Sequence, residues 1–280
     1  MTEIAQPTTV DEGPIRTPVR IALTAVMFLT RIHVPSWVSH APDDLARSTA
    51  WFPLVGMVVG MIGAAAGLPG LYWWNPVIAA VAAVAATVRI TGAFHEDALA
   101  DACDGFGGGW TVEQVLTIMK DSRIGSYGAI GLLLVTVMRI SALTVIGGHS
   151  TRMFVAALIA GHTLGRWSSL PLIAGLRYVS VADASKSKPF AASVTPARLV
   201  AGSATALGVL MLLFGDVRVI AVLLALAISV TFILARYFRR RIGGMTGDCL
   251  GAANQAVELT TYLALASAPI LMHEVAVWWR

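Results

Sequence analysis

Charged residues are scarce in this chain. Asp, Glu, Lys and Arg together make up 13% of its 280 residues, whereas a soluble globular protein carries about 25%. Hydrophobic residues make up 56%, and the mean hydropathy is +0.74. This composition argues against a soluble domain and predicts an integral membrane protein.

Cysteine is scarce as well. The two cysteines, Cys103 and Cys249, are too few for a disulfide framework. Each lies beside a carboxylate, Asp104 in one case and Asp248 in the other. We therefore expect both to be free thiols.

The first residues lack the pattern of a signal peptide, because no apolar core follows a basic start at the right distance. Residues 1–18 hold three prolines among Thr, Asp and Glu, which predicts a disordered tail. The net charge of +4 comes from basic residues at the ends of apolar runs, as in membrane orientation signals. We therefore expect no nucleic-acid partner.

Apolar runs separated by polar turns make up most of the chain. Run 19–34 is interrupted by Arg20 and Arg31 and is too short to cross about 30 Å of hydrocarbon. It predicts an interfacial or re-entrant helix. Longer runs occupy 51–72, 77–94, 126–146, 153–174, 198–214, 218–235 and a last segment ending near residue 272. The expected fold is all-α, a polytopic membrane helix bundle of about seven transmembrane helices, with residues 19–280 as one integral-membrane catalytic domain.

Glycines four apart in the first long run, Gly56 and Gly60, predict a close helix–helix contact. The alternative is that membrane helices simply tolerate glycine.

An acidic segment directly follows the second long run. It contains His95, Glu96, Asp97, Asp101 and Asp104. If the segment is helical, its three aspartates share one face, because residues three and four apart are neighbours on a helix. Such carboxylates repel one another unless a cation lies among them, and oxygen ligands suit Mg²⁺. The alternative is a solvated acidic helix face.

Two other polar segments combine groups suited to metal or phosphate. Lys120, Asp121 and Arg123 follow a glycine-rich stretch and offer a carboxylate beside two cations. The glycine-rich turn at 243–247 opens a predicted helix, whose free N–H groups suit phosphate. Polar candidates in or near that helix are Thr246, Gly247, Asp248, Asn254 and Glu258.

Three basic groups lie inside apolar runs. Arg89 calls for a phosphate or carboxylate partner, or else reaches the nearby interface. His162 and Arg166 are four apart and share a helix face. Arg166 is a phosphate-binding candidate, while His162 is either a substrate ligand or a structural histidine.

Strict alternation of the spans places the acidic segment, the 175–197 loop and the 236–245 loop on one side. Nearly all Lys and Arg then lie on that side, and only Arg152, Arg218 and Arg280 remain outside. The positive-inside rule makes it the cytoplasmic side. Both acidic motifs therefore meet at one membrane face, as a single active site requires.

The chain resembles the cobalamin-5′-phosphate synthase family, whose activity is adenosylcobinamide-GDP ribazoletransfer. The resemblance extends from Phe28-Leu29-Thr30-Arg31 through the last span. Its motifs are Phe94-His95-Glu96-Asp97-Ala98-Leu99-Ala100-Asp101 with Asp104-Gly105, Lys120-Asp121-Ser122-Arg123-Ile124-Gly125, and Gly243-Gly244-x-Thr246-Gly247-Asp248-x-x-Gly251-Ala252. Ala98 departs from the glycine of the family pattern, which removes backbone freedom but no ligand.

The resemblance implies an enzyme of the bacterial inner membrane that uses Mg²⁺ and faces the cytoplasm. Its substrates are adenosylcobinamide-GDP and α-ribazole or its 5′-phosphate, and its products are adenosylcobalamin or its phosphate and GMP. Further expected partners are the lipid bilayer, other late cobalamin-pathway enzymes or a second copy of the chain. The implied roles are metal ligation by Asp97, Asp101 and Asp104, with Asp121 or Asp248 as further ligands; catalysis by His95, Glu96 and Arg166; and substrate binding by Lys120, Arg123, Arg89, His162, Thr246, Gly247 and Asn254.

Two other functions fit parts of the pattern. The spacing of Asp97, Asp101 and Asp104 is similar to that of CDP-alcohol phosphotransferases, but those enzymes carry further aspartates at closer spacing. A transporter with buried Arg89 and Arg166 is the third hypothesis. The gathering of acids at one face and the lack of an inverted repeat argue against it.

Overall fold

The computed structural model describes residues 16–38, 42–180 and 194–267, and its regular elements in these ranges are helices. The elements are α1 (Arg16–Leu29), α2 (Pro42–Ser48), η1 (Thr49–Trp51), α3 (Phe52–Trp73), α4 (Pro76–Thr91), α5 (Phe94–Gly108), α6 (Val112–Met119), α7 (Ser126–His149), α8 (Thr151–Gly175), α10 (Pro196–Leu213), α11 (Val217–Ile242) and α12 (Gly247–Ser267). The all-α prediction is confirmed. Because α1 begins at Arg16, residues 16–18 are helical, and the rest of the tail expected at 1–18 lies outside the described residues.

Within the described ranges, four helical segments are long and apolar enough to cross a membrane: Asp43–Trp73, α7, α10 and α11. The count is five if α4 and α5, which meet at 89°, form one broken span. The expected number of about seven is therefore not confirmed. Helices α8 and α12 have 25 and 21 residues but carry buried polar side chains, including Arg166 and Glu258.

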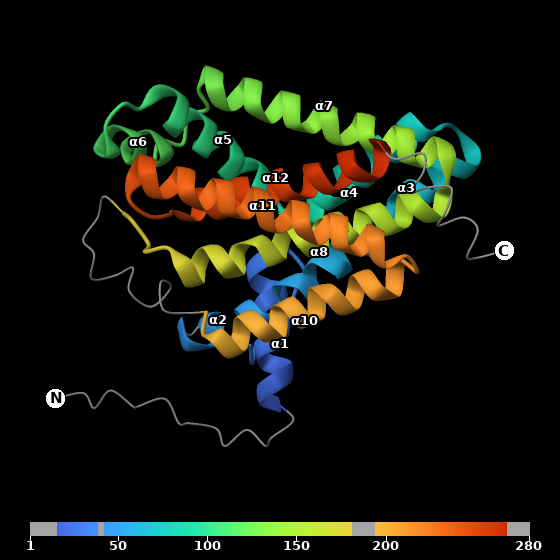
Figure 1. The fold of residues 1–280 in the computed structure, drawn as a ribbon, viewed down its shortest axis with the longest axis horizontal. Coiled ribbons are helices and arrows are strands. Elements are labelled where there is room, and N and C mark those ends of the chain that lie inside the picture. Colours follow the sequence, from blue (N-terminus) through green and yellow to red (C-terminus); the bar gives the residue numbers. More distant parts are fainter. Residues whose placement is uncertain (1–15, 39–41, 181–193, 268–280) are drawn as a thin grey trace.

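Most of the long helices run roughly side by side along the long axis of the molecule (Figure 1). At one end lie α5, α6, the end of α8 and the junction of α11 with α12; the α3–α4, α7–α8 and α10–α11 turns lie at the other end (Figure 1). Helix α8 is buried along most of its length and packs against α3 and α12. This arrangement agrees with the alternation expected from the sequence.

The contact between α3 and α8 depends on glycine. A Cβ on Gly56 would overlap the carbonyl oxygen of His162, and one on Gly60 would lie 2.6 Å from the Cα of Ile159. Only glycine lets the two backbones approach this closely. The contact predicted from Gly56 and Gly60 is confirmed.

A sharp bend between α4 and α5 redirects the chain into the acidic segment. Gly92 and Ala93 both adopt left-handed backbone angles, with φ of 68° and 60°. Gly92 accommodates this conformation readily, whereas the backbone of Ala93 is strained because its Cβ lies close to the carbonyl oxygen. The bend sets α5 across the end of the bundle, so its first turn faces α12 rather than continuing α4.

We predict opposite effects of one substitution at two helical glycines. Gly60→Ala should lower stability by about 1–3 kcal/mol because the added methyl overpacks the α3–α8 contact. Gly208→Ala in α10, where a Cβ meets nothing within 4 Å, should raise stability by up to about 1 kcal/mol through helix propensity. Thermal unfolding in detergent measures both. Equal shifts in the two variants would contradict the packing described for α3 and α8.

Candidate functional site

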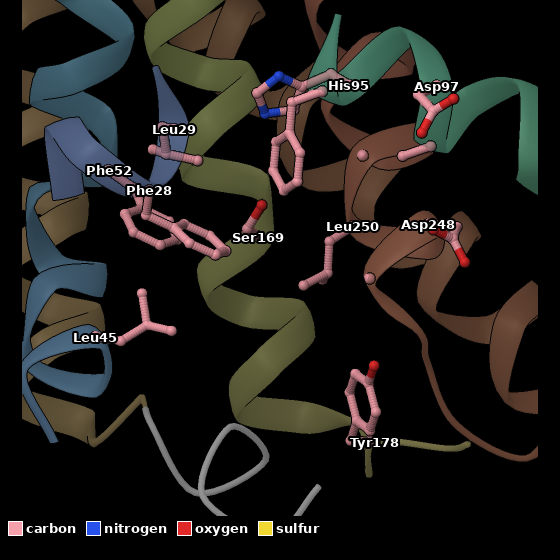
Figure 2. A pocket seen from close by; sticks show the side chains of 14 residues that line it. Phe28, Leu29, Leu45, Phe52, His95, Asp97, Ser169, Tyr178, Asp248 and Leu250 are labelled. Atoms are coloured by element: carbon pink, nitrogen blue, oxygen red, sulfur yellow. The ribbon is translucent and has the colours of Figure 1, made fainter. Parts of the chain in front are cut away.

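A cavity of about 410 Å³ lies where α1, α2, α3, α5, α8 and α12 meet. It is lined by Phe28, Leu29, Leu45, Phe52, Phe94, His95, Asp97, Ala98, Ser169, Tyr178, Gly247, Asp248, Leu250 and Gly251. Figure 2 shows Asp97 and Asp248 on one side and the apolar side chains of α1–α3 on the other. The two acidic motifs, about 150 residues apart, therefore meet in one cavity, as the sequence predicts.

Local structure brings each motif to this cavity. The bend after α4 starts α5 at Phe94, so His95 and Asp97 lie in its first turn. A short parallel bridge joins the chain after α8 to the turn before α12, with Val179 N donating to Met245 O at 2.8 Å and Met245 N donating to Arg177 O at 2.9 Å. The bridge holds the intervening Tyr178 at the cavity.

Helices α5 and α12 make a close contact between the two motifs. A Cβ built on Gly251 would overlap the Cβ of Ala98. The methyl of Ala98, the residue that departs from the family pattern, therefore occupies space that glycine at 251 leaves free. Thr246 supports the same end of α12, because its Oγ1 accepts the N–H of Cys249 at 3.2 Å.

The carboxylates at this end of the bundle influence one another. They lie in α5 and the first turn of α12, outside the four helices that qualify as spans. Burial and, to a smaller extent, the nearby charges of Asp248, Asp97 and Asp104 together raise the pKa of Asp101 to about 6. Burial also raises the pKa of Asp248, with a smaller contribution from Asp97. This mutual repulsion favours a bound cation.

The described residues contain no group of three or more His, Cys, Asp or Glu side chains that could hold a metal ion. The expected cluster of Asp97, Asp101 and Asp104, with Asp121 or Asp248 as a further ligand, therefore does not form such a group in this part of the chain. However, Asp97 and Asp248 provide two carboxylates to one cavity. Mg²⁺ is often held by one or two carboxylates, with substrate phosphates and water completing its coordination. The residues fit an ion bound in that way.

Asp104 is buried and serves as an anchor for α7. Its two oxygens accept the N–H groups of Gly125 at 2.7 Å and of Gly128 at 2.8 Å. It lines a different hollow, of about 530 Å³, together with Asp121 and Arg123. Of the metal ligands expected from the sequence, Asp97 and Asp248 line one hollow, Asp104 and Asp121 line another, and Asp101 lines neither.

Asp121 and Arg123 form an exposed ion pair with N–O distances down to 2.6 Å. The hydrogen bonds from Arg123 lower the pKa of Asp121 to about 2. Lys120 donates to the hydroxyl of Ser180 at 3.2 Å, and Arg89 is exposed in the last turn of α4. None of these three cations lines the cavity that holds Asp97 and Asp248.

Glu258 lies at the centre of a fully buried polar network inside the bundle. Its Oε1 lies 2.6 Å from Arg139 Nη2 and accepts the hydroxyl of Tyr262 at 3.1 Å. Its Oε2 lies 2.9 Å from His162 Nδ1 and 3.2 Å from Arg166 Nη1. One carboxylate thus links α12 to both α7 and α8.

The same network reaches α5 through Glu96. Its Oε1 accepts from Arg139 Nη1 and from Gln255 Nε2, both at 3.0 Å. Two arginines and two glutamates balance the buried charge of this network. Glu96 does not line the cavity, whereas its neighbour His95 does. Of the two expected proton acceptors, only His95 therefore faces the cavity.

Arg166 also belongs to this network and not to the cavity wall. Its Nη1 lies 2.6 Å from His162 Nδ1 and 3.4 Å from Asn254 Oδ1, and its Nη2 lies 3.5 Å from His95 Nδ1. His162 Nδ1 thus lies between a group that only donates, the Arg166 guanidinium, and one that only accepts, the Glu258 carboxylate at 2.9 Å. His162 and Asn254 thus contact Arg166 in the buried network and do not line the cavity, whereas Gly247 does.

Sequence reasoning missed several residues of this region. Arg139 is an arginine in the middle of an apolar helix, and that signal marks a buried polar network. Ser169 and Tyr178, which present hydroxyls at the cavity (Figure 2), have no comparable local signal.

Removing one charge from the network should destabilise the protein strongly. We expect Glu258→Gln to lower stability by about 3–5 kcal/mol, because it leaves the two arginines with one glutamate in a buried site. Glu113→Gln, at an exposed position in the first turn of α6, is the matched control and should change stability by less than about 0.5 kcal/mol. Thermal unfolding in detergent measures both. Similar melting temperatures for the two variants would contradict the role assigned to Glu258.

Comparisons with known proteins identify the family. The family described as cobalamin-5-phosphate synthase matches residues 21–266. Proteins named adenosylcobinamide-GDP ribazoletransferase from Shewanella pealeana and Shewanella halifaxensis are 46% and 44% identical to the chain, each over 86% of it and 92% of the relative. That of Shewanella piezotolerans is 41% identical over 89% of the chain and 96% of the relative. No solved structure matches. The chain belongs to the cobalamin-5-phosphate synthase family.

Proposed function

We propose that the protein is a membrane enzyme that transfers the adenosylcobinamide-phosphate group of adenosylcobinamide-GDP to α-ribazole or its 5′-phosphate. The observation that carries the proposal is the meeting of Asp97 and Asp248, from the two family motifs, in one cavity. The relatives carry the name of this activity over nearly their whole length. No comparison favours the CDP-alcohol phosphotransferase or the transporter.

The reaction is a substitution at phosphorus. A ribose hydroxyl of the ribazole attacks the phosphorus attached to cobinamide, and a new P–O bond forms. The bond from that phosphorus to the bridging oxygen of the diphosphate breaks, and GMP leaves with this oxygen. The hydroxyl proton is released. The protein therefore has to position two substrates and offset developing negative charge.

We assign the residues of the cavity different roles in this reaction. Asp97 and Asp248 would hold Mg²⁺, which supplies charge stabilisation of the diphosphate and of the leaving GMP. His95 is our candidate to accept the hydroxyl proton, because it lines the same cavity. Burial, and to a smaller extent the charge of Asp248, raises the pKa of Tyr178, which keeps this phenol protonated as a hydrogen-bond donor.

We place the site at the cytoplasmic face of the bacterial inner membrane. Helix α5 and the start of α12, which both contribute residues to the cavity, lie at the end of the bundle that also carries the arginines at the end of α11. The positive-inside rule supports this orientation.

The most direct assay uses the purified protein in detergent. With adenosylcobinamide-GDP, α-ribazole and Mg²⁺, chromatography should detect GMP and a cobalamin in equal amounts. Chelation with EDTA should abolish product formation, and added Mg²⁺ should restore it. Consumption of a CDP-alcohol in place of adenosylcobinamide-GDP would overturn the proposal.

Loss of either cavity carboxylate should slow the reaction. We expect Asp97→Asn and Asp248→Asn each to lower kcat at least about 100-fold, the scale of losing charge stabilisation in the transition state. Asp216→Asn is the control: Asp216 caps α11 at the opposite end of the bundle, and asparagine is an equally good cap. Near-normal turnover in both cavity variants would refute their assignment.

A further inference from the structure

The cavity at Asp97 and Asp248 has two unlike halves. One half is apolar and is built by side chains of α1, α2, α3 and the first residue of α5. The other half is polar and carries His95, Asp97, Ser169, Tyr178 and Asp248 (Figure 2). A cavity of this kind suits a ligand with one apolar and one polar end.

Three phenylalanine rings build the apolar half. Phe28 stacks on Phe52 with ring centroids 5.9 Å apart and an interplanar angle of 13°. It meets Phe94 edge-on, with centroids 5.6 Å apart and an angle of 74°. The Phe94 ring is 44% exposed, although its neighbour His95 is buried. The wall is therefore preformed, and it suits a flat aromatic group.

An aromatic group bound against this wall also needs an apolar ring edge, because the surrounding side chains cannot hydrogen-bond to it. Phe28, Leu29, Leu45, Phe52 and Phe94 offer no side-chain hydrogen-bond donor or acceptor. A guanine buried here would leave its polar edge unsatisfied, at a cost of about 1–3 kcal/mol for each group. A methylated benzimidazole, the base of ribazole, has an apolar edge, so its burial leaves no polar group on that edge unsatisfied.

The polar half is acidic. Among the described residues that line the cavity there are two aspartates and neither a lysine nor an arginine. Carboxylates accept hydrogen bonds from ribose hydroxyls, and they repel a diphosphate unless a cation such as the proposed Mg²⁺ lies between them. The polar half therefore suits the sugar of a nucleoside.

The volume agrees with this ligand. About 410 Å³ lies near the lower end of the range of roughly 300–1,000 Å³ for small-molecule sites. It admits a nucleoside, whereas a corrin macrocycle with its side chains is far larger.

We infer that this cavity binds the ribazole substrate. The benzimidazole base lies against the wall of Phe28, Phe52 and Phe94, and the ribose hydroxyls point toward Asp97 and Asp248. The corrinoid and the guanosine remain outside the cavity. This inference rests on the proposed function and adds which substrate occupies the site.

Steady-state kinetics of the full-length protein test the inference with Phe94→Ala. We expect the KM for α-ribazole to rise at least about tenfold, the scale of losing one large apolar contact, and the KM for adenosylcobinamide-GDP to change less than twofold. Phe232→Ala removes a ring that is 67% exposed on α11 and should change neither KM. A rise confined to the KM for adenosylcobinamide-GDP, or no rise in either KM, would overturn the inference.

A second variant tests the apolar wall without disturbing His95, the candidate proton acceptor. Phe94 contacts the His95 ring at a centroid distance of 5.2 Å, whereas Leu45 lies on a separate helix, on the apolar side of the cavity (Figure 2). Leu45→Ala should likewise raise only the KM for α-ribazole.

Equilibrium dialysis with α-ribazole separates this inference from the proposed function. The wild-type protein should bind α-ribazole even if no transfer is detected, and Phe94→Ala should weaken that binding at least about tenfold. Binding without transfer would refute the proposed function alone. Failure of the wild-type protein to bind α-ribazole, or equal binding by Phe94→Ala, would refute the occupant proposed here.

Discussion

A buried carboxylate between two arginines sets the relative positions of the central helices. Glu258 of α12 binds Arg139 of α7 and Arg166 of α8, and Arg139 in turn binds Glu96 of α5. Each of these charges lies away from water, so each depends on its partner for compensation. The helices therefore cannot shift independently, and the first turns of α5 and α12 are held facing one another.

The cavity follows from that constraint together with two local features. The left-handed angles at Gly92 and Ala93 turn the chain by 89° into α5. The small side chain of Ala98 and the bare backbone of Gly251 then let α5 and α12 approach closely. As a result, acids from distant parts of the sequence share one cavity, where two carboxylates can bind a cation completed by phosphate oxygens.

Sequence patterns predicted the helices well and the partners of individual side chains poorly. Apolar runs separated by polar turns predicted the positions of the long helices, and the glycine spacing predicted the close contact of α3 with α8 at Gly56. Helical spacing predicted one shared face for Asp97, Asp101 and Asp104, but Asp97 and Asp104 line different hollows. Asp104 binds backbone N–H groups of α7 and Arg166 binds a glutamate of α12, because tertiary packing decides these contacts. The cavity wall at Phe28 and Tyr178 comes from segments far apart in sequence, so no local pattern reveals it.

The central claim is that the two motifs face one cavity, and cross-linking of paired cysteines tests it most directly. In a protein carrying Cys103→Ser and Cys249→Ser, a short bis-maleimide should join the thiols of the Asp97→Cys, Asp248→Cys pair, as detected by mass spectrometry of the digested protein. The Asp121→Cys, Asp248→Cys pair lines two different hollows and should remain unlinked. Equal linking of both pairs, or none in the first, would contradict the account.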